Sequence, residues 1–155
     1  AVAHAVGVGA VMFHDLKNAR TNNFDFALEE VVQFEGETGP YVQYTHARAM
    51  SILRKANHTV DTKEAFSLTD DDAWEVLKLI ENYPNVVRFA EEKCEPSAIA
   101  KFVINLAQAF NKYYAHTKVL VEDEAFNSRI ALVQTTASIL KQGLALLGVA
   151  APDEM

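Results

Sequence analysis

The sequence predicts an all-α protein, a helical bundle, on the strength of three observations. Apolar residues recur with the period of an α-helix along nearly the whole chain, and no convincing pair of strands can be found. Half of the 155 residues are apolar, which is enough to bury a core. The four prolines and the glycines of the stretch GETGP fall near places where a helical segment would begin or end.

Helical segments are expected over residues 1–13, 24–34, 40–57, 70–82, 85–94, 97–117 and 125–147. Pro40 suits the first turn of the segment that it opens, because a first-turn N–H has no helical partner. Thr69 and Asp72 resemble a capping box. Pro84 is expected to end the segment that follows them, since proline breaks the interior of a helix. Gly148 is expected to stop the last helix.

Charge is segregated along the chain. The formal net charge of −7 argues by itself against a nucleic-acid partner. However, residues 41–60 and residues 96–121 each hold three cations and no acid, whereas residues 61–95 are strongly acidic. A local basic surface is therefore expected within an acidic protein.

Cysteine usage and hydropathy restrict the class of protein further. Cys94 is the only cysteine, which excludes an intramolecular disulfide and a thiolate zinc cluster and favours the reducing cytoplasm. No apolar run approaches the ~18 residues of a membrane span, and no signal peptide leads the chain. The first residue is Ala1 rather than methionine, so we expect a fragment of a longer protein.

The segment over residues 40–57 carries a second stripe beside its apolar face. This stripe contains Tyr41, Tyr44, Arg48, Ser51 and Lys55, which recur with helical spacing about 100° around the helix from the core positions. Aromatic rings and a guanidinium group on one flank offer stacking surfaces and phosphate neutralisation together, as single-stranded nucleic acids require. The alternative is a half-buried tyrosine pair with solvated cations beyond it.

The segment over residues 97–117 repeats this combination of rings and cations. Tyr113 and Tyr114 are adjacent, and neighbours in a helix diverge by about 100°, so one of the two rings is expected to be exposed. Lys112 lies outside the apolar stripe of the same segment. A second aromatic and basic helix favours a nucleic-acid surface.

No catalytic centre and no metal site can be recognised. Gly7 and Gly9 lack both the third glycine and the preceding strand of a dinucleotide-binding loop. The histidines show no metal-binding spacing, no serine lies in a nucleophile elbow, and the acidic clusters 70–72 and 122–124 lack calcium-loop spacing. We therefore expect a binding module rather than a free-standing enzyme.

Four stretches give the chain a recognisable likeness: GAVMFHDLKNARTNNFDF, FEGETGPYVQYTHARAMSILRK, LAQAFNKYYAHTKVLV and LKQGLALLGVAAPDEM. In this order they closely resemble the C-terminal part of bacterial arginyl-tRNA synthetases, over nearly the whole chain. The resemblance implies a helical bundle of the anticodon-binding type found in class I synthetases, named for its DALR signature. Residues 1–22 would be the junction with the catalytic domain, and residues 23–155 the anticodon-binding domain.

The resemblance also implies what this chain lacks. The HIGH and KMSK-like signatures of the family's ATP site do not occur in it. ATP and arginine would bind the absent catalytic domain, so the fragment would hold no cofactor and would be inactive alone. Within the whole enzyme it would take part in the ATP-dependent joining of arginine to its tRNA, with arginine tRNA and the catalytic domain as its partners.

The anticodon contacts that the resemblance implies are Tyr41, Gln43, Tyr44, Arg48, Tyr114 and Met155. Further contacts to the tRNA are expected from Tyr113, Asn111, Lys55, Lys112 and Lys118. The rings would stack on unpaired bases, the amides would contact base edges, and the lysines would neutralise phosphates. The position of Met155 suggests that the tail folds back towards the bases. The alternative function is a helical module that docks only onto protein, through the apolar segment AVAHAVGVGAVMF.

Overall fold

The computed structural model describes residues 2–155, and the regular structure in that range is entirely helical. In chain order the helices are α1 (Val2–Lys17), α2 (Leu28–Val31), α3 (Gly39–Ala56), α4 (Asp71–Lys93), α5 (Ser97–His116) and α6 (Phe126–Leu146). The all-α class is therefore confirmed. Ala1, with which the first expected helix began, lies outside the described residues.

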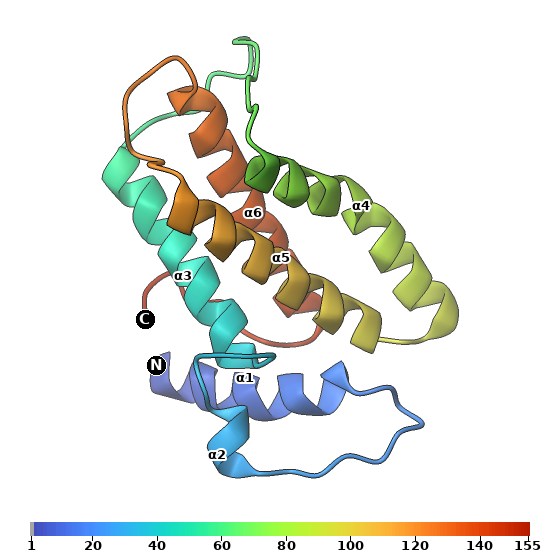
Figure 1. Ribbon diagram of the computed structural model, residues 1–155. Helices are drawn as coiled ribbons and strands as arrows, with labels where there is room; N and C mark the ends of the chain where they lie inside the picture. The colour runs from blue at the N-terminus through green and yellow to red at the C-terminus, as the bar shows by residue number, and fades with distance from the viewer. Residues whose placement is uncertain (1) are drawn as a thin grey trace.

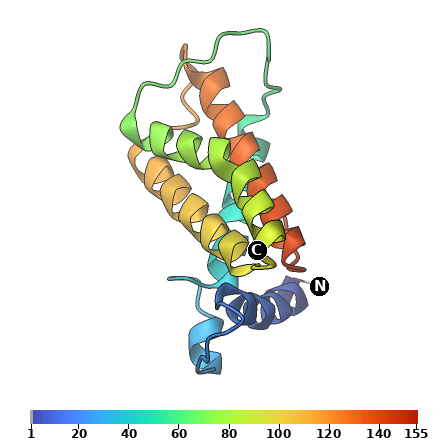
Figure 2. The same ribbon diagram turned by 90° about the vertical axis from the view of Figure 1, so that its right-hand side faces the viewer.

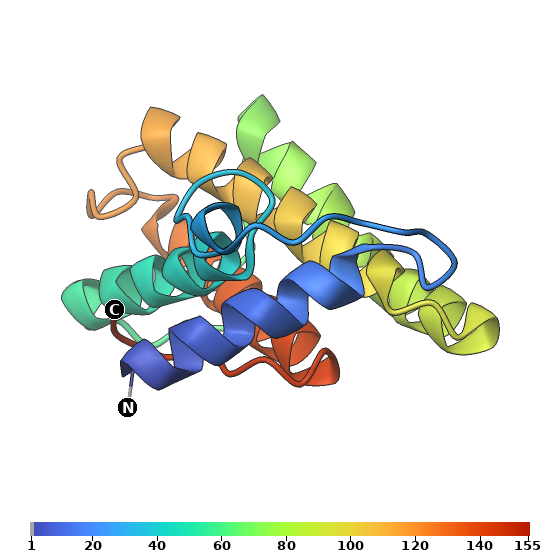
Figure 3. The same ribbon diagram turned by 90° about the horizontal axis from the view of Figure 1, so that it is seen from below.

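The long helices α3, α4, α5 and α6 form a bundle, and α1 lies across one end of it (Figure 1). α5 packs against α3, α4 and α6, and α1 packs against both α3 and α5. The loops that follow α3 and α5 project at the end opposite α1 (Figure 2). Seen from below, α1 runs under the bundle, and its first turn lies on the same side as the C-terminal tail (Figure 3).

The core lies where α5 meets its neighbours. α5 contributes Leu106 and Phe110, α6 contributes Ile130 and Leu140, and α1 adds Phe13, all fully buried. Burying one such side chain stabilises the fold by roughly 1.5–3 kcal/mol. The apolar stripes that the sequence shows at helical spacing are thus the faces on which the helices pack.

The expected break at Pro84 was wrong, because α4 continues through that residue to Lys93. Proline removes one helical hydrogen bond and costs roughly 3 kcal/mol in a helix interior. Val76 and Ala90, on either side of the proline, are both buried, and the ring of Tyr83 lies 5.3 Å from that of Phe102 on α5. Continuous packing of both halves of α4 against the bundle therefore outweighs the local cost.

Three other boundaries differ from the expectation. α1 continues to Lys17, four residues beyond the expected end at residue 13. The cap of α4 is Asp70 rather than Thr69, since its Oδ1 accepts a hydrogen bond of 2.8 Å from the backbone N–H of Ala73. Around α2 only Leu28–Val31 is helical, and the flanking Phe34 is exposed instead of packing inward. A single turn cannot form a helix face wide enough to bury the apolar residues of residues 24–34.

None of the helices in residues 2–155 is both long enough and apolar enough to span a bilayer.

Candidate nucleic-acid interface

Tyr44, Arg48 and Tyr114 form one continuous surface between α3 and α5. The Cζ atom of Arg48 lies 4.9 Å from the centroid of the Tyr44 ring and 5.7 Å from that of Tyr114. Tyr44 and Arg48 are one helical turn apart on α3, whereas Tyr114 comes from the last turns of α5. Both rings are accessible, with 40% of Tyr44 and 38% of Tyr114 exposed. We call these three residues the tyrosine–arginine stack.

Asn111 holds the guanidinium group of this stack in place. Its Oδ1 accepts a hydrogen bond of 2.6 Å from Nη1 of Arg48. Its Nδ2 donates to the hydroxyl of Tyr41 at 3.0 Å and to Oγ1 of Thr45 at 2.8 Å, so both amide protons are used. Nη2 of Arg48 lies 3.4 Å from the hydroxyl of Tyr44. These hydrogen bonds place the guanidinium group of Arg48 between the two rings.

An apolar hollow of about 650 Å³ adjoins the stack and shares Tyr44 with it. Its walls are formed by Val2, Ala3, Val6, Gly7, Phe34, Tyr44 and Met155. The ring of Phe34 meets that of Tyr44 edge to face, with the centroids 6.4 Å apart. We call this space the α1–tail hollow, because α1 and the C-terminal tail provide most of its walls. A flat, partly apolar group such as a nucleobase fits such a space.

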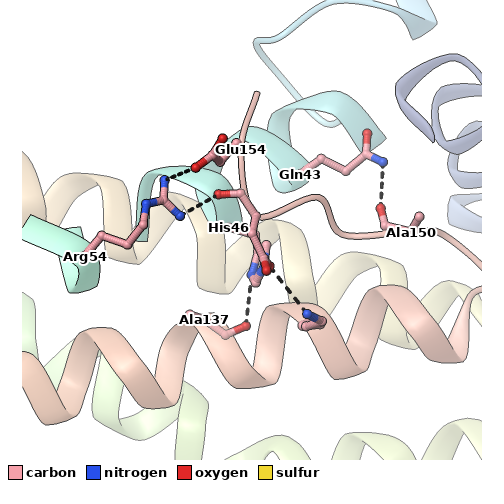
Figure 4. A network of polar contacts seen from close by, with 8 residues as sticks. Gln43, His46, Arg54, Ala137, Ala150 and Glu154 are labelled. Atoms are coloured by element: carbon pink, nitrogen blue, oxygen red, sulfur yellow. Dashed lines mark hydrogen bonds and ion pairs between the residues drawn. The ribbon is translucent and has the colours of Figure 1, made fainter. Parts of the chain in front are cut away.

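The tail after α6 lies back across α3, as the sequence suggested (Figure 4). The backbone oxygen of Ala150 accepts a hydrogen bond of 2.7 Å from Gln43. The carboxylate of Asp153 lies 3.1 Å from the imidazole of His46, and Arg54 contacts both Asp153 and Glu154. This course brings Met155 to the hollow.

Two of the expected contact residues, Gln43 and Tyr113, lie inside the protein rather than on its surface. Gln43 is fully buried, and its Nε2 donates to the backbone oxygens of Ala5 and Ala150 at 3.1 and 2.7 Å. Tyr113 is fully buried as well, and this burial raises the pKa of its hydroxyl. The physical reason is helical geometry: each residue is adjacent to an exposed tyrosine and therefore points towards a different side of its helix.

The remaining expected residues differ in how accessible they are. Tyr41 is half-buried, and its hydroxyl is engaged by Asn111. Lys55 and Lys118 are exposed. Lys112 is exposed too, but its Nζ lies 2.9 Å from Oδ1 of Asp72.

Asp72 faces two basic groups of α5. Its Oδ2 lies 2.6 Å from Nδ1 of His116, and the hydrogen bonds from His116 and Lys112 hold the pKa of its carboxyl group below the usual range. The charge of Lys112 is therefore partly compensated within the protein. Of the three expected lysines, Lys55 and Lys118 are the better candidates for phosphate contacts.

Phe34 and His46 take part in this region without having been identified from the sequence as site residues. Phe34 lies in the segment 24–34, and its ring is exposed beside that of Tyr44. His46 lies on α3 and is buried under the tail. Both depend on contacts between distant segments, which periodicity does not report. Within the part of the chain that the structure describes, no group of three or more acidic, histidine or cysteine residues is arranged to hold a metal ion.

Comparison with known proteins gives one consistent result. Residues 42–155 match the family described as the DALR anticodon binding domain. The arginine–tRNA ligase of Enterococcus faecalis is 64% identical over 154 residues, which are 99% of this chain and 27% of that protein. The arginine–tRNA ligase of Streptococcus thermophilus is 57% identical over all of this chain and 28% of its own length.

Solved structures agree. The arginyl-tRNA synthetase of Thermus thermophilus superposes with a TM-score of 0.90 at 36% identity, covering 99% of this chain and 27% of that one. The arginyl-tRNA synthetase of Plasmodium falciparum gives a TM-score of 0.91 at 26% identity, covering 99% of this chain and 28% of that one. The chain thus spans little more than a quarter of the length of the relatives that it matches. Because the family match covers most of the sequence, the chain belongs to the DALR anticodon binding domain family, in the form that occurs in arginyl-tRNA synthetases.

Proposed function

We propose that this chain reads the anticodon of arginine tRNA on behalf of an arginine–tRNA ligase, and that the tyrosine–arginine stack and the α1–tail hollow are the reading surface. The observation that carries the proposal is the ordered arrangement of Tyr44, Arg48 and Tyr114, which come from two helices and expose both rings. Sequence-specific recognition of RNA commonly uses unstacked loop bases, aromatic stacking and hydrogen bonds to base edges.

Each part of the surface has a distinct task in this proposal. The rings of Tyr44 and Tyr114 stack on anticodon bases, and the guanidinium group of Arg48 supplies charge and N–H donors between them. A splayed base enters the hollow and packs against Phe34 and Met155. Lys55 and Lys118 neutralise backbone phosphates. Tyr41 and Asn111 support the arginine and do not face the base directly.

The remaining parts of the whole enzyme's activity lie outside this chain in the proposal. In this proposal ATP and arginine bind a catalytic part of the whole enzyme, in the length of the relatives that this chain does not cover. Residues 1–22 join that catalytic part to the anticodon-binding residues 23–155. The exposed side chains of Val8 and Val11, one turn apart on α1, support this junction, since they offer an apolar face for the catalytic part. The cytoplasm is the compartment in which such an enzyme would meet its tRNA.

The variant Tyr44→Ala tests this function. We expect it to weaken binding of arginine tRNA by about 1–3 kcal/mol, the contribution of one stacked base. The free energy of unfolding should change little, because the ring lies at the surface and 40% of the residue is exposed. Binding is measured by titration with arginine tRNA, and stability by denaturant unfolding.

Phe89→Ala is the matched control, because Phe89 is another exposed ring, 50% exposed against 40% for Tyr44, on α4, a helix that packs on α5 and α6. It should leave the affinity for tRNA unchanged. A loss of stability in Tyr44→Ala with unaltered affinity would show that the ring is structural. If the parent chain ignored tRNA altogether, the protein-docking alternative would be the better description.

A further inference from the structure

The C-terminal tail is fastened to the bundle by a buried histidine. His46 on α3 is only 1% exposed. Its Nδ1 lies 3.1 Å from the backbone oxygen of Ala137 on α6, and its Nε2 lies 3.1 Å from Oδ1 of Asp153 in the tail (Figure 4). One ring therefore connects three separate parts of the protein.

Both neighbours of the ring are hydrogen-bond acceptors. A backbone carbonyl can only accept, and an ionised carboxylate can only accept. The hydrogen bond from His46 holds the pKa of Asp153 below its usual range, so this carboxylate is ionised at neutral pH. A proton on Nε2 of the ring satisfies this carboxylate, so the contact is a hydrogen bond from His46 to an ionised acceptor. A charge-assisted hydrogen bond of this kind is roughly twice as strong as a neutral one.

The other contacts of the tail end are weaker. Nζ of Lys141 lies 3.4 Å from Oδ1 of Asp153, and Nη2 of Arg54 lies 3.6 Å from Oε1 of Glu154. All four of these side chains are largely exposed, and exposed ion pairs contribute about 0–1 kcal/mol. Nη1 of Arg54 also donates to the backbone oxygen of Asp153 at 3.1 Å, but this side chain is 46% exposed. The contact between His46 and Asp153 is therefore the one that a buried side chain makes with the end of the tail.

The buried Gln43 acts in the same direction from one turn earlier on α3. Its Nε2 donates both to Ala5 on α1 and to Ala150 in the tail. α1 and the tail provide most of the walls of the α1–tail hollow. The interior polar side chains of α3 thus set the positions of both walls, although neither side chain lines the hollow.

We propose that His46 and Asp153 are positioning residues for base recognition: their contact fixes the tail so that Met155 forms a wall of the hollow. This inference rests on the proposed function of that hollow. Asp153 lies two residues before Met155, so release of its carboxylate frees the methionine from its place. Neither His46 nor Asp153 needs to touch RNA.

A double-mutant cycle between Asp153→Ala and Met155→Ala tests the proposal. Each of the two single variants should weaken binding of arginine tRNA by about tenfold. This factor corresponds to the burial of one mid-sized apolar side chain. The double variant should bind no more weakly than Met155→Ala, because Asp153 acts only through that methionine. Asp153→Asn should restore part of the affinity, since its amide oxygen still accepts a hydrogen bond from His46.

Glu154→Ala is the matched control, because Glu154 is the neighbouring acid and forms only an exposed ion pair. It should change the affinity less than twofold, or about 0.4 kcal/mol. Effects of Asp153→Ala and Met155→Ala that multiply would overturn the proposal. An Asp153→Ala variant that binds as tightly as the parent would overturn it too.

Amide hydrogen exchange of residues 149–155 is a second readout that does not depend on RNA. We expect exchange to accelerate in Asp153→Ala and in His46→Phe, but not in Glu154→Ala. A chain that does not bind tRNA but shows this acceleration would refute the proposed function and leave the fastening of the tail intact. Unchanged exchange in Asp153→Ala would refute the fastening itself.

Discussion

Replacing Arg48 with alanine is expected to weaken binding of arginine tRNA by about 2–4 kcal/mol, more than the loss of either tyrosine alone. A specific arginine contact to nucleic acid contributes roughly 1–3 kcal/mol. Removing the guanidinium group also leaves the rings of Tyr44 and Tyr114 free to move. The rings must then be ordered when RNA binds, which costs about 0.5–1.5 kcal/mol for each side chain. The two effects act on the same surface, so they reinforce each other.

Arg88→Ala is the control for charge. Arg88 is an exposed arginine of α4, and its one hydrogen bond to a side chain among the described residues, to Asn85, is long at 3.5 Å. Its loss should change the affinity by less than about 0.5 kcal/mol, the usual scale of a surface substitution. Arg48→Lys should bind with intermediate affinity, because lysine keeps the charge but lacks the planar fork that reaches Asn111. Equal losses in Arg48→Ala and Arg88→Ala would mean that only net charge matters.

The second large effect concerns stability. Gly143 on α6 lies against Val103 on α5, and a Cβ atom at this glycine would collide with Cγ1 of Val103. Both residues are buried, so the valine has no space into which to move. We expect Gly143→Ala to lower the free energy of unfolding by about 1–3 kcal/mol, the usual cost of overpacking.

Gly7→Ala is the matched control on α1. A Cβ atom there meets nothing within 4 Å, so the substitution should stabilise the protein by about 0.5–1 kcal/mol through helix propensity. Denaturant unfolding of both variants measures the difference. A stability of Gly143→Ala equal to that of the parent would show that α5 and α6 can separate at this crossing without cost.

Much of the fold follows from local patterns in the sequence. The stripes of apolar residues predict α3, α5 and α6 nearly to their ends, because each helix buries one continuous face. Pro84 misled the expectation for α4, since a local rule about proline carries no information on the packing that spans it. Predicted helix boundaries are wrong where tertiary contacts outweigh the local preference of the sequence.

The candidate site could also be predicted only in part from local patterns in the sequence. Spacing places Tyr44 and Arg48 on one flank of α3, and the structure brings Tyr114 to the same flank. Spacing does not say which helix covers which side, so Gln43 and Tyr113 were assigned to the surface although neighbouring elements bury them. The α1–tail hollow depends on segments from both ends of the chain, and no local pattern reports such a meeting.

The proposed function depends on recognition of anticodon bases rather than on general attraction to RNA. Titrating this chain with arginine tRNA, and with the same tRNA altered only in its anticodon, tests that claim most directly. Loss of one recognised base costs roughly 1–3 kcal/mol, so the altered tRNA should bind about 5- to 150-fold more weakly. Equal affinities for the two tRNAs would contradict the account.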